Sequence, residues 1–113
     1  MTKFNARSIE IDGHRFDSAA EGRRYASLAM LERAGKIASL EVHPRFDCLV
    51  AGVKICTDVA DFRYRRDGAA VVEDVKGVRT AVYRLKRKLA EACHPGLVIT
   101  EIPAAGADRP RRR

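Results

Sequence analysis

The chain alternates between short stretches with a polar–apolar period of two and two longer stretches with helical spacing. A hairpin is predicted at the start, because Ile9 and Ile11 alternate with polar residues and Asp12-Gly13 is a favoured two-residue turn. Further strands are predicted over residues 37–42, 46–50, 54–64, 69–76 and 97–102.

Two helices are predicted between these strands. Ser18 and Glu21 have the spacing of a capping box, which predicts a helix from residue 19 to about Ala34, with Gly35 as its C-cap. A second helix is expected over residues 80–92, with an apolar side formed by Val82, Leu85, Leu89 and Cys93. If 37–42 and 46–50 are one strand broken at residues 43–45, the order after the hairpin is helix, three strands, helix, strand. This order predicts a mixed α/β fold with one sheet covered by helices.

Length and composition narrow the class of protein. The 113 residues suffice for one domain, expected over residues 1–103 and followed by a basic tail at 104–113. No apolar run approaches the roughly 18–20 residues of a membrane span, and the first residues lack the apolar segment of a signal peptide. Three widely spaced cysteines argue against a disulfide framework or a Cys-rich zinc site. We therefore expect a cytoplasmic protein with no membrane contact and no organic cofactor.

The net charge of +7 is concentrated in two segments. Residues 79–91 carry five basic residues and one acidic residue, and residues 108–113 carry four arginines and one aspartate. A local excess of this kind favours a polyanionic partner, most simply the phosphate backbone of a nucleic acid. The alternative is a solvated helix face and a solubilising tail.

Candidate chemistry lies on the second and third predicted strands. Because side chains alternate along a strand, Asp74 and Lys76 face one way and Glu73 the other. A hairpin between these strands can bring Asp61 beside Asp74, where the two carboxylates repel unless a proton or a divalent cation joins them. Mg²⁺ accepts such oxygen ligands, and Lys76 would then stand beside water on the ion. Glu21 points with the core-facing residues of the first helix, which is costly for a carboxylate without a cationic partner.

Each of these residues also has a structural explanation. Glu21 could serve only the capping box. Asp61 could pair with Arg63 or Arg65, and Asp74 with Lys76 could be a surface salt bridge worth about 0.2–1 kcal/mol. A β-bulge would exchange the directions of Glu73 and Asp74. His43 stands alone in an expected loop and is taken as structural.

Several motifs occur in order along the chain: Asp12-Gly13-x-x-Phe16-Asp17-Ser18-x-x-Glu21, Pro44-x-Phe46, Ala60-Asp61-Phe62 and Glu73-Asp74-Val75-Lys76-Gly77. Together they resemble the PD-(D/E)xK nuclease superfamily, although Ala60 stands where that name expects proline. Within it, the match is similar to a small phage-associated family described only as domains of unknown function or as endonucleases. The resemblance covers roughly residues 3–102.

The resemblance implies a core like that of restriction endonucleases, in the order α-β-β-β-α-β, and a metal-dependent activity. Asp61 and Asp74 would bind Mg²⁺ together with the carbonyl of Val75, and Mn²⁺ would be able to substitute. Lys76 would orient the attacking water and offset charge on the phosphate. Glu21 would bind a second metal ion or hold a water on the metal.

The function expected on this basis is a Mg²⁺-dependent endonuclease that hydrolyses DNA phosphodiesters. Little of the chain lies outside the core, so we expect structure-specific cutting of junctions, flaps or nicks by a homodimer in a phage or mobile element. Phosphate contacts near the site are expected from Thr80, Tyr83 and Lys86, and DNA backbone contacts from the outward Arg84, Arg87 and Lys88. The alternatives are a nucleic-acid-binding module that cuts nothing, using the basic helix and tail, and an accessory subunit active only with a partner.

Overall fold

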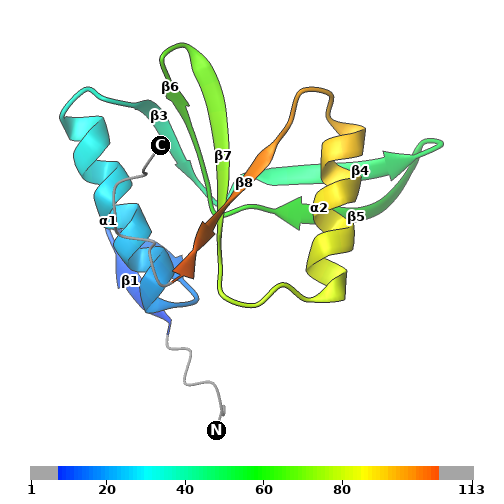
Figure 1. The fold of residues 1–113 in the computed structure, drawn as a ribbon, viewed down its shortest axis with the longest axis horizontal. Helices are drawn as coiled ribbons and strands as arrows, with labels where there is room; N and C mark the ends of the chain where they lie inside the picture. The colour runs from blue at the N-terminus through cyan, green and yellow to red at the C-terminus, as the bar shows by residue number, and fades with distance from the viewer. Residues whose placement is uncertain (1–7, 105–113) are drawn as a thin grey trace, which may run out of the picture.

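The computed structural model describes residues 8–104, and Figure 1 shows how their elements are arranged. In chain order these elements are β1 (Ile9–Ile11), β2 (His14–Phe16), α1 (Ala19–Arg33), β3 (Ala38–Val42), β4 (Arg45–Val50), β5 (Val53–Val59), β6 (Phe62–Arg66), β7 (Ala69–Lys76), α2 (Ala81–Cys93) and β8 (Ile99–Pro103).

The centre of the molecule is a four-stranded sheet in the order β3-β6-β7-β8. β6 runs antiparallel to both β3 and β7, and β8 returns parallel to β7 after the crossover through α2. β1 and β2 form the N-terminal hairpin and β4 and β5 a separate two-stranded ribbon. The predicted mixed α/β fold with an N-terminal β-hairpin is confirmed.

The single strand predicted over residues 54–64 is wrong, because the chain breaks at Ala60 and Asp61 and the two halves join different sheets. The opposite break, between β3 and β4, falls at His43 and Pro44. The two breaks are bonded to each other: His43 N–H donates to the Asp61 carbonyl at 2.9 Å and Ala60 N–H to the Pro44 carbonyl at 3.0 Å. Pro44 has no N–H to continue a ladder, and His43 has a left-handed φ of 58°. The β4–β5 ribbon therefore turns away from the central sheet at this junction.

Different elements pack on the two faces of the central sheet. On one face lies α1, above a core cluster that includes Phe16, Leu28, Phe62, Val75 and Ile102. On the other face lie α2 and the ribbon, whose buried cluster is Phe46, Cys48, Ala60, Val72, Ala90 and Ile99. Since side chains alternate along β7, Glu73 and Asp74 are buried toward opposite faces.

Both helix starts are capped by the residues that the sequence suggests. Ser18 Oγ accepts a hydrogen bond from Glu21 N–H at 3.2 Å, and Thr80 Oγ1 accepts one from Tyr83 N–H at 3.1 Å. α1 ends at Arg33, and Gly35 follows with a φ of 78°. The cap fixes the first turn of α1, which carries Glu21.

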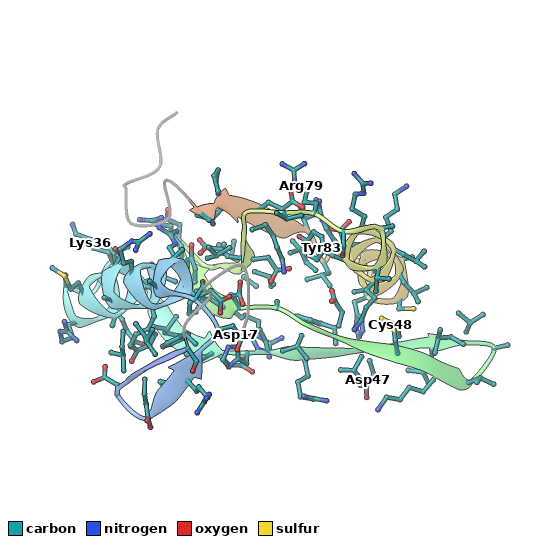
Figure 2. The ribbon with its side chains drawn as sticks, turned by 90° about the horizontal axis from the view of Figure 1, so that it is seen from below. Asp17, Lys36, Asp47, Cys48, Arg79 and Tyr83 are labelled. Carbon is teal, nitrogen blue, oxygen red and sulfur yellow. The ribbon has the colours of Figure 1, made fainter. Side chains whose placement is uncertain are left out.

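The expected apolar side of α2 is only partly used. Leu89, Ala90 and Cys93 pack against the β4–β5 ribbon, but Val82 and Leu85 are each 66% exposed, so this part of the prediction is wrong. The helix crosses over the ribbon instead of lying flat on the central sheet (Figure 1), which leaves its first half uncovered. In Figure 2, Cys48 points from the ribbon toward α2 and Asp47 points away from it. Neither α1 nor α2 is long and apolar enough to cross a membrane.

Candidate metal centre

Glu73 and Asp74 are neighbours on β7 with different environments. Glu73 is 1% exposed and accepts two hydrogen bonds from Arg24 of α1, at 2.9 and 2.7 Å, and one from the Tyr64 hydroxyl at 2.5 Å. Its pairing is complete, and its role is structural. The register of β6 with β7 is continuous, so no bulge exchanges the two acidic residues. Asp74 is therefore the residue that faces Lys76.

The structure brings Asp61 and Asp74 together at the break between β5 and β6. Asp61 N–H donates to Asp74 Oδ1 at 3.0 Å, while Asp61 Oδ2 accepts from Val75 N–H at 2.7 Å. Val75 thus orients Asp61 through its amide, and a role for its carbonyl stays a prediction. The alternative ion pairs of Asp61 do not form, because Arg63 pairs with Glu41 and Arg65 donates to the Gly68 carbonyl.

Glu21 reaches the same place from the first turn of α1. Its Oε1 accepts a long hydrogen bond, 3.4 Å, from Asp17 N–H, so the residue has a part in the helix start. Ligand atoms of Glu21, His43 and Asp61 also lie within 4.8 Å of one another, and all three side chains are half-buried. Asp74 lies outside this group of three but is joined to it by its bond to Asp61.

His43 is a residue of the centre that the sequence interpretation missed. Its ring packs 5.8 Å from that of Phe16, and its N–H is bonded to the Asp61 carbonyl. The signal that could have found it is the paired strand order: if residues 37–50 and 54–64 form one long hairpin, the break at His43 falls opposite Asp61.

Burial and crowding raise the pKa values of the carboxyl groups of the centre. Burial, and then the charge of Asp61, raises the pKa of Glu21 to about 7 and that of Asp74 to about 7. Burial also raises the pKa of Asp61, against the opposing effect of the Val75 N–H. The site therefore favours either protons or a bound cation.

Lys76 lies at the end of β7 and its positive charge acts on every acidic group of this region. It opposes the rise in pKa of Glu21, Asp61 and Asp74. Its Nζ lies 4.3 Å from the centroid of the Tyr83 ring, which holds it by a cation–π contact. Asp74 is 2% exposed, so a surface salt bridge between these residues is not what the structure shows.

Asp58 of β5 is a second buried carboxylate that the sequence interpretation missed. Within residues 8–104 its Oδ2 has no hydrogen-bond partner. Burial raises its pKa, the charges of Lys86 and Lys76 oppose this, and its own charge raises the pKa of Asp74. The signal was available in the strand alternation, which places Asp58 on the same inward face as Ala60.

The residues of α2 predicted to contact phosphates divide into two groups. One group is exposed: Thr80 at the start of the helix, and Arg84 and Lys88 further along it. Lys86, in contrast, is half-buried, and its charge acts on Asp58. The outward direction predicted for Arg87 is wrong, because its guanidinium lies between Glu91 and Glu101, at 3.4 and 3.0 Å. Tyr83 donates its hydroxyl hydrogen to Glu101 at 2.9 Å. Figure 2 shows Tyr83 and Arg79 together on this side of the molecule.

The fold and this arrangement define a mixed α/β protein with a centre of three carboxylates, one histidine and one lysine. Residues 1–105 match the model of the family DUF1064, described as a protein of unknown function, and the chain belongs to this family. No curated protein matches the chain. The resemblance to a family of unknown function is thus confirmed, and the resemblance to PD-(D/E)xK nucleases remains a prediction.

Proposed function

We propose that the protein is a Mg²⁺-dependent endonuclease of the PD-(D/E)xK type that hydrolyses DNA phosphodiester bonds. The observation that carries this proposal is the juxtaposition of Asp61 with Asp74 at the end of β7, with Lys76 on the same face and Glu21 entering from α1. A protein that only binds DNA gains nothing from carboxylates at the place where it meets phosphate, since like charges repel.

The donor set fits a divalent cation. Ligand atoms around an octahedral ion with bonds of about 2.1 Å are roughly 3–4.2 Å apart, and those of Glu21, His43 and Asp61 lie within 4.8 Å before any ion draws them in. Burial and mutual repulsion raise the pKa values of these carboxyl groups, and a cation removes that cost. The buried, unpartnered Oδ2 of Asp58 adds negative potential next to Asp74.

Each side chain has a distinct part in the proposed hydrolysis. Asp61 and Asp74 would hold the ion and Glu21 would hold a second ion or a water, while Val75 keeps Asp61 in place through its N–H. A bound ion supplies Lewis-acid activation of the phosphodiester and of water. Lys76, fixed over Tyr83, donates a hydrogen bond to the attacking water and offsets the negative charge that builds on phosphorus. Water adds in line, the P–O3′ bond breaks, and a 5′-phosphate and a 3′-hydroxyl remain.

The surface offered to the DNA backbone begins at the start of α2. Thr80 caps this helix, whose first N–H groups favour an anion, and Arg84 and Lys88 are exposed on its flank. Arg87 contributes less, since two glutamates already neutralise it. The basic tail at 104–113 lies beyond the described residues, apart from Ala104.

A homodimer that cuts branched, flapped or nicked DNA of a phage or mobile element is the form of this activity we propose. Large apolar side chains are exposed on α2 and on the ribbon: Leu49, Val50, Val53, Ile55, Val59, Val82 and Leu85. Apolar surface of this extent favours a protein partner, and a symmetric pair would present two centres to two strands.

The test is cleavage of supercoiled, single-stranded and four-way-junction DNA with Mg²⁺, Mn²⁺ or EDTA. We expect metal-dependent cutting that Asp74→Asn abolishes and that Lys76→Met reduces by about 10²–10³-fold. The matched controls are Asp47→Asn and Lys54→Met, an exposed acidic and an exposed basic residue of the ribbon that pair with each other at 3.5 Å. Both control variants should cut as the wild type does.

Two results would contradict the proposal. One is DNA cutting that persists in EDTA. The other is cutting by Asp74→Asn and Lys76→Met that is as fast as cutting by the wild type. Salt-sensitive DNA binding with no cutting of any substrate would instead favour the non-catalytic binding module.

A further inference from the structure

His43 belongs to the group of possible donor atoms described above, but the proposed hydrolysis assigns it no role. A ring nitrogen of His43 lies within 4.8 Å of carboxylate oxygens of both Glu21 and Asp61. The three residues come from three places in the chain: the start of α1, the break after β3 and the break after β5. Their convergence therefore depends on tertiary structure and not on sequence neighbourhood.

The position of the His43 ring is fixed from several sides. The backbone has a φ of 58°, a conformation that is unfavourable for a residue with a side chain and persists only where the surroundings hold it. Here the surroundings are the buried Pro44, the bond from His43 N–H to the Asp61 carbonyl, and the ring of Phe16 at 5.8 Å. The ring is thus presented to the carboxylates before any ligand arrives.

We propose that His43 is a nitrogen ligand of the divalent cation, and that it makes the centre select a first-row ion such as Mn²⁺ over Mg²⁺. Imidazole nitrogen raises the affinity of a site for first-row transition ions, least of all for Mn²⁺, whereas Mg²⁺ prefers oxygen ligands and retains its waters; Mn²⁺ is therefore the most stringent of these ions for the comparison. His43 adds one nitrogen to the carboxylate oxygens of Asp61, Asp74 and Glu21 in the proposed cation site, which leaves positions for water and a phosphate oxygen. The inference rests on the cation site of the proposed function but not on DNA cleavage.

A neutral ligand also suits the electrostatics of this centre. The charge of Asp61 already acts on Glu21, and the charges of Asp61 and Asp58 act on Asp74. A further carboxylate would add to that repulsion, whereas an imidazole adds a donor atom with no charge.

The test is pulsed electron paramagnetic resonance of Mn²⁺ bound to the full chain without DNA. We expect electron spin-echo modulation from a directly coordinated ¹⁴N, replaced by the ¹⁵N pattern when the protein is labelled with ¹⁵N-histidine. The labelled wild type makes this result independent of any variant. In titrations, Mn²⁺ should bind more tightly than Mg²⁺, and His43→Gln should reduce that preference by at least about tenfold, a loss that even outer ligand-shell substitutions can reach.

The matched control is His94→Gln. His94 lies at the end of α2, where Nε2 is 2.7 Å from the Asp47 carbonyl, a contact that the glutamine amide can keep. This variant should retain both the nitrogen modulation and the Mn²⁺ preference. Bound Mn²⁺ without histidine modulation, unchanged selectivity in folded His43→Gln, or no Mn²⁺ binding at all would overturn the inference. The first two results leave DNA cleavage through an all-oxygen centre standing, and nitrogen coordination without cleavage would remove the proposed function alone.

Discussion

Glu73 and Asp74 are adjacent on β7 and almost equally buried, yet the two faces of the sheet treat them in opposite ways. On the α1 face, Glu73 receives a bidentate guanidinium and a phenol hydroxyl. On the α2 face, Asp74 accepts the Asp61 N–H and otherwise meets the negative charges of Asp61 and Asp58, opposed by Lys76. A buried charge with a full set of hydrogen-bond and ion-pair partners has a structural role. A buried carboxylate surrounded by like charges lowers the stability of the fold, which makes it a candidate for binding a ligand.

The largest change in the free energy of unfolding should come from breaking the ion pair between Arg24 and Glu73. Arg24→Ala leaves the buried Glu73 without its cationic partner and with only the Tyr64 hydroxyl bonded to it, so we expect the free energy of unfolding to fall by about 3–5 kcal/mol, measured by urea denaturation. Adding Glu73→Gln should recover part of this loss because it removes the uncompensated charge. Arg33→Ala, on the exposed last turn of α1, should change stability by less than about 0.5 kcal/mol. An Arg24→Ala effect as small as that of the control would contradict the comparison.

Replacing Asp74 is expected to change stability in the opposite direction, that is, to increase the free energy of unfolding. The native pKa values of Asp74 and Glu21, each about 7, lie above the ordinary 3.8 and 4.5, so the folded protein holds extra protons between about pH 4 and 7. In EDTA, the free energy of unfolding should therefore decrease as pH rises through this window. Asp74→Asn removes part of this slope and should be about 1–3 kcal/mol more stable than the wild type at pH 8, with little difference at pH 4.

Asp47→Asn is the control for the sign of this effect. The hydrogen bond from Thr57 lowers the pKa of Asp47, so its charged form is favoured in the folded state. Its contribution is present above the ordinary pKa and lost in acid, and the asparagine variant should gain nothing at pH 8. Thermal melts of both variants at pH 4 and 8 decide the matter. Equal destabilisation of Asp74→Asn at both pH values would show that the carboxylate is not under strain.

The smallest change in stability is expected for the exposed apolar side chains of α2. Leu85→Ala should change the stability of the monomer by less than about 0.5 kcal/mol because the side chain is already largely in water. The corresponding change on the α1 face, Leu28→Ala, removes a fully buried side chain and should cost about 2–5 kcal/mol. Denaturation at two protein concentrations distinguishes packing from association, since a loss at Leu85 that grows with concentration indicates an interface between copies.

Local rules were sufficient for part of this structure. The capping box placed the start of α1, and strand alternation separated Asp74 from Glu73 and put Lys76 with Asp74. Other features depend on contacts distant in sequence. Arg24 is a partner of Glu73 across 49 residues, and the meeting of His43 with Asp61 follows from two breaks that turn a long hairpin out of the sheet. The half-exposed apolar stripe of α2 is a third case, because no local pattern says how a helix will cross its neighbour.

The junction at residues 43–44 and 60–61 joins the central sheet to the outward ribbon, and it also carries two of the side chains proposed as metal ligands. His43 and Asp61 sit on the pivot itself, while Glu21 and Asp74 belong to the sheet side. The spacing of the side chains of His43 and Asp61 therefore depends on the same backbone hydrogen bonds that set the direction of the ribbon. If the centre holds a cation, as proposed, the direction of the ribbon and the geometry of that cation site are linked through this junction.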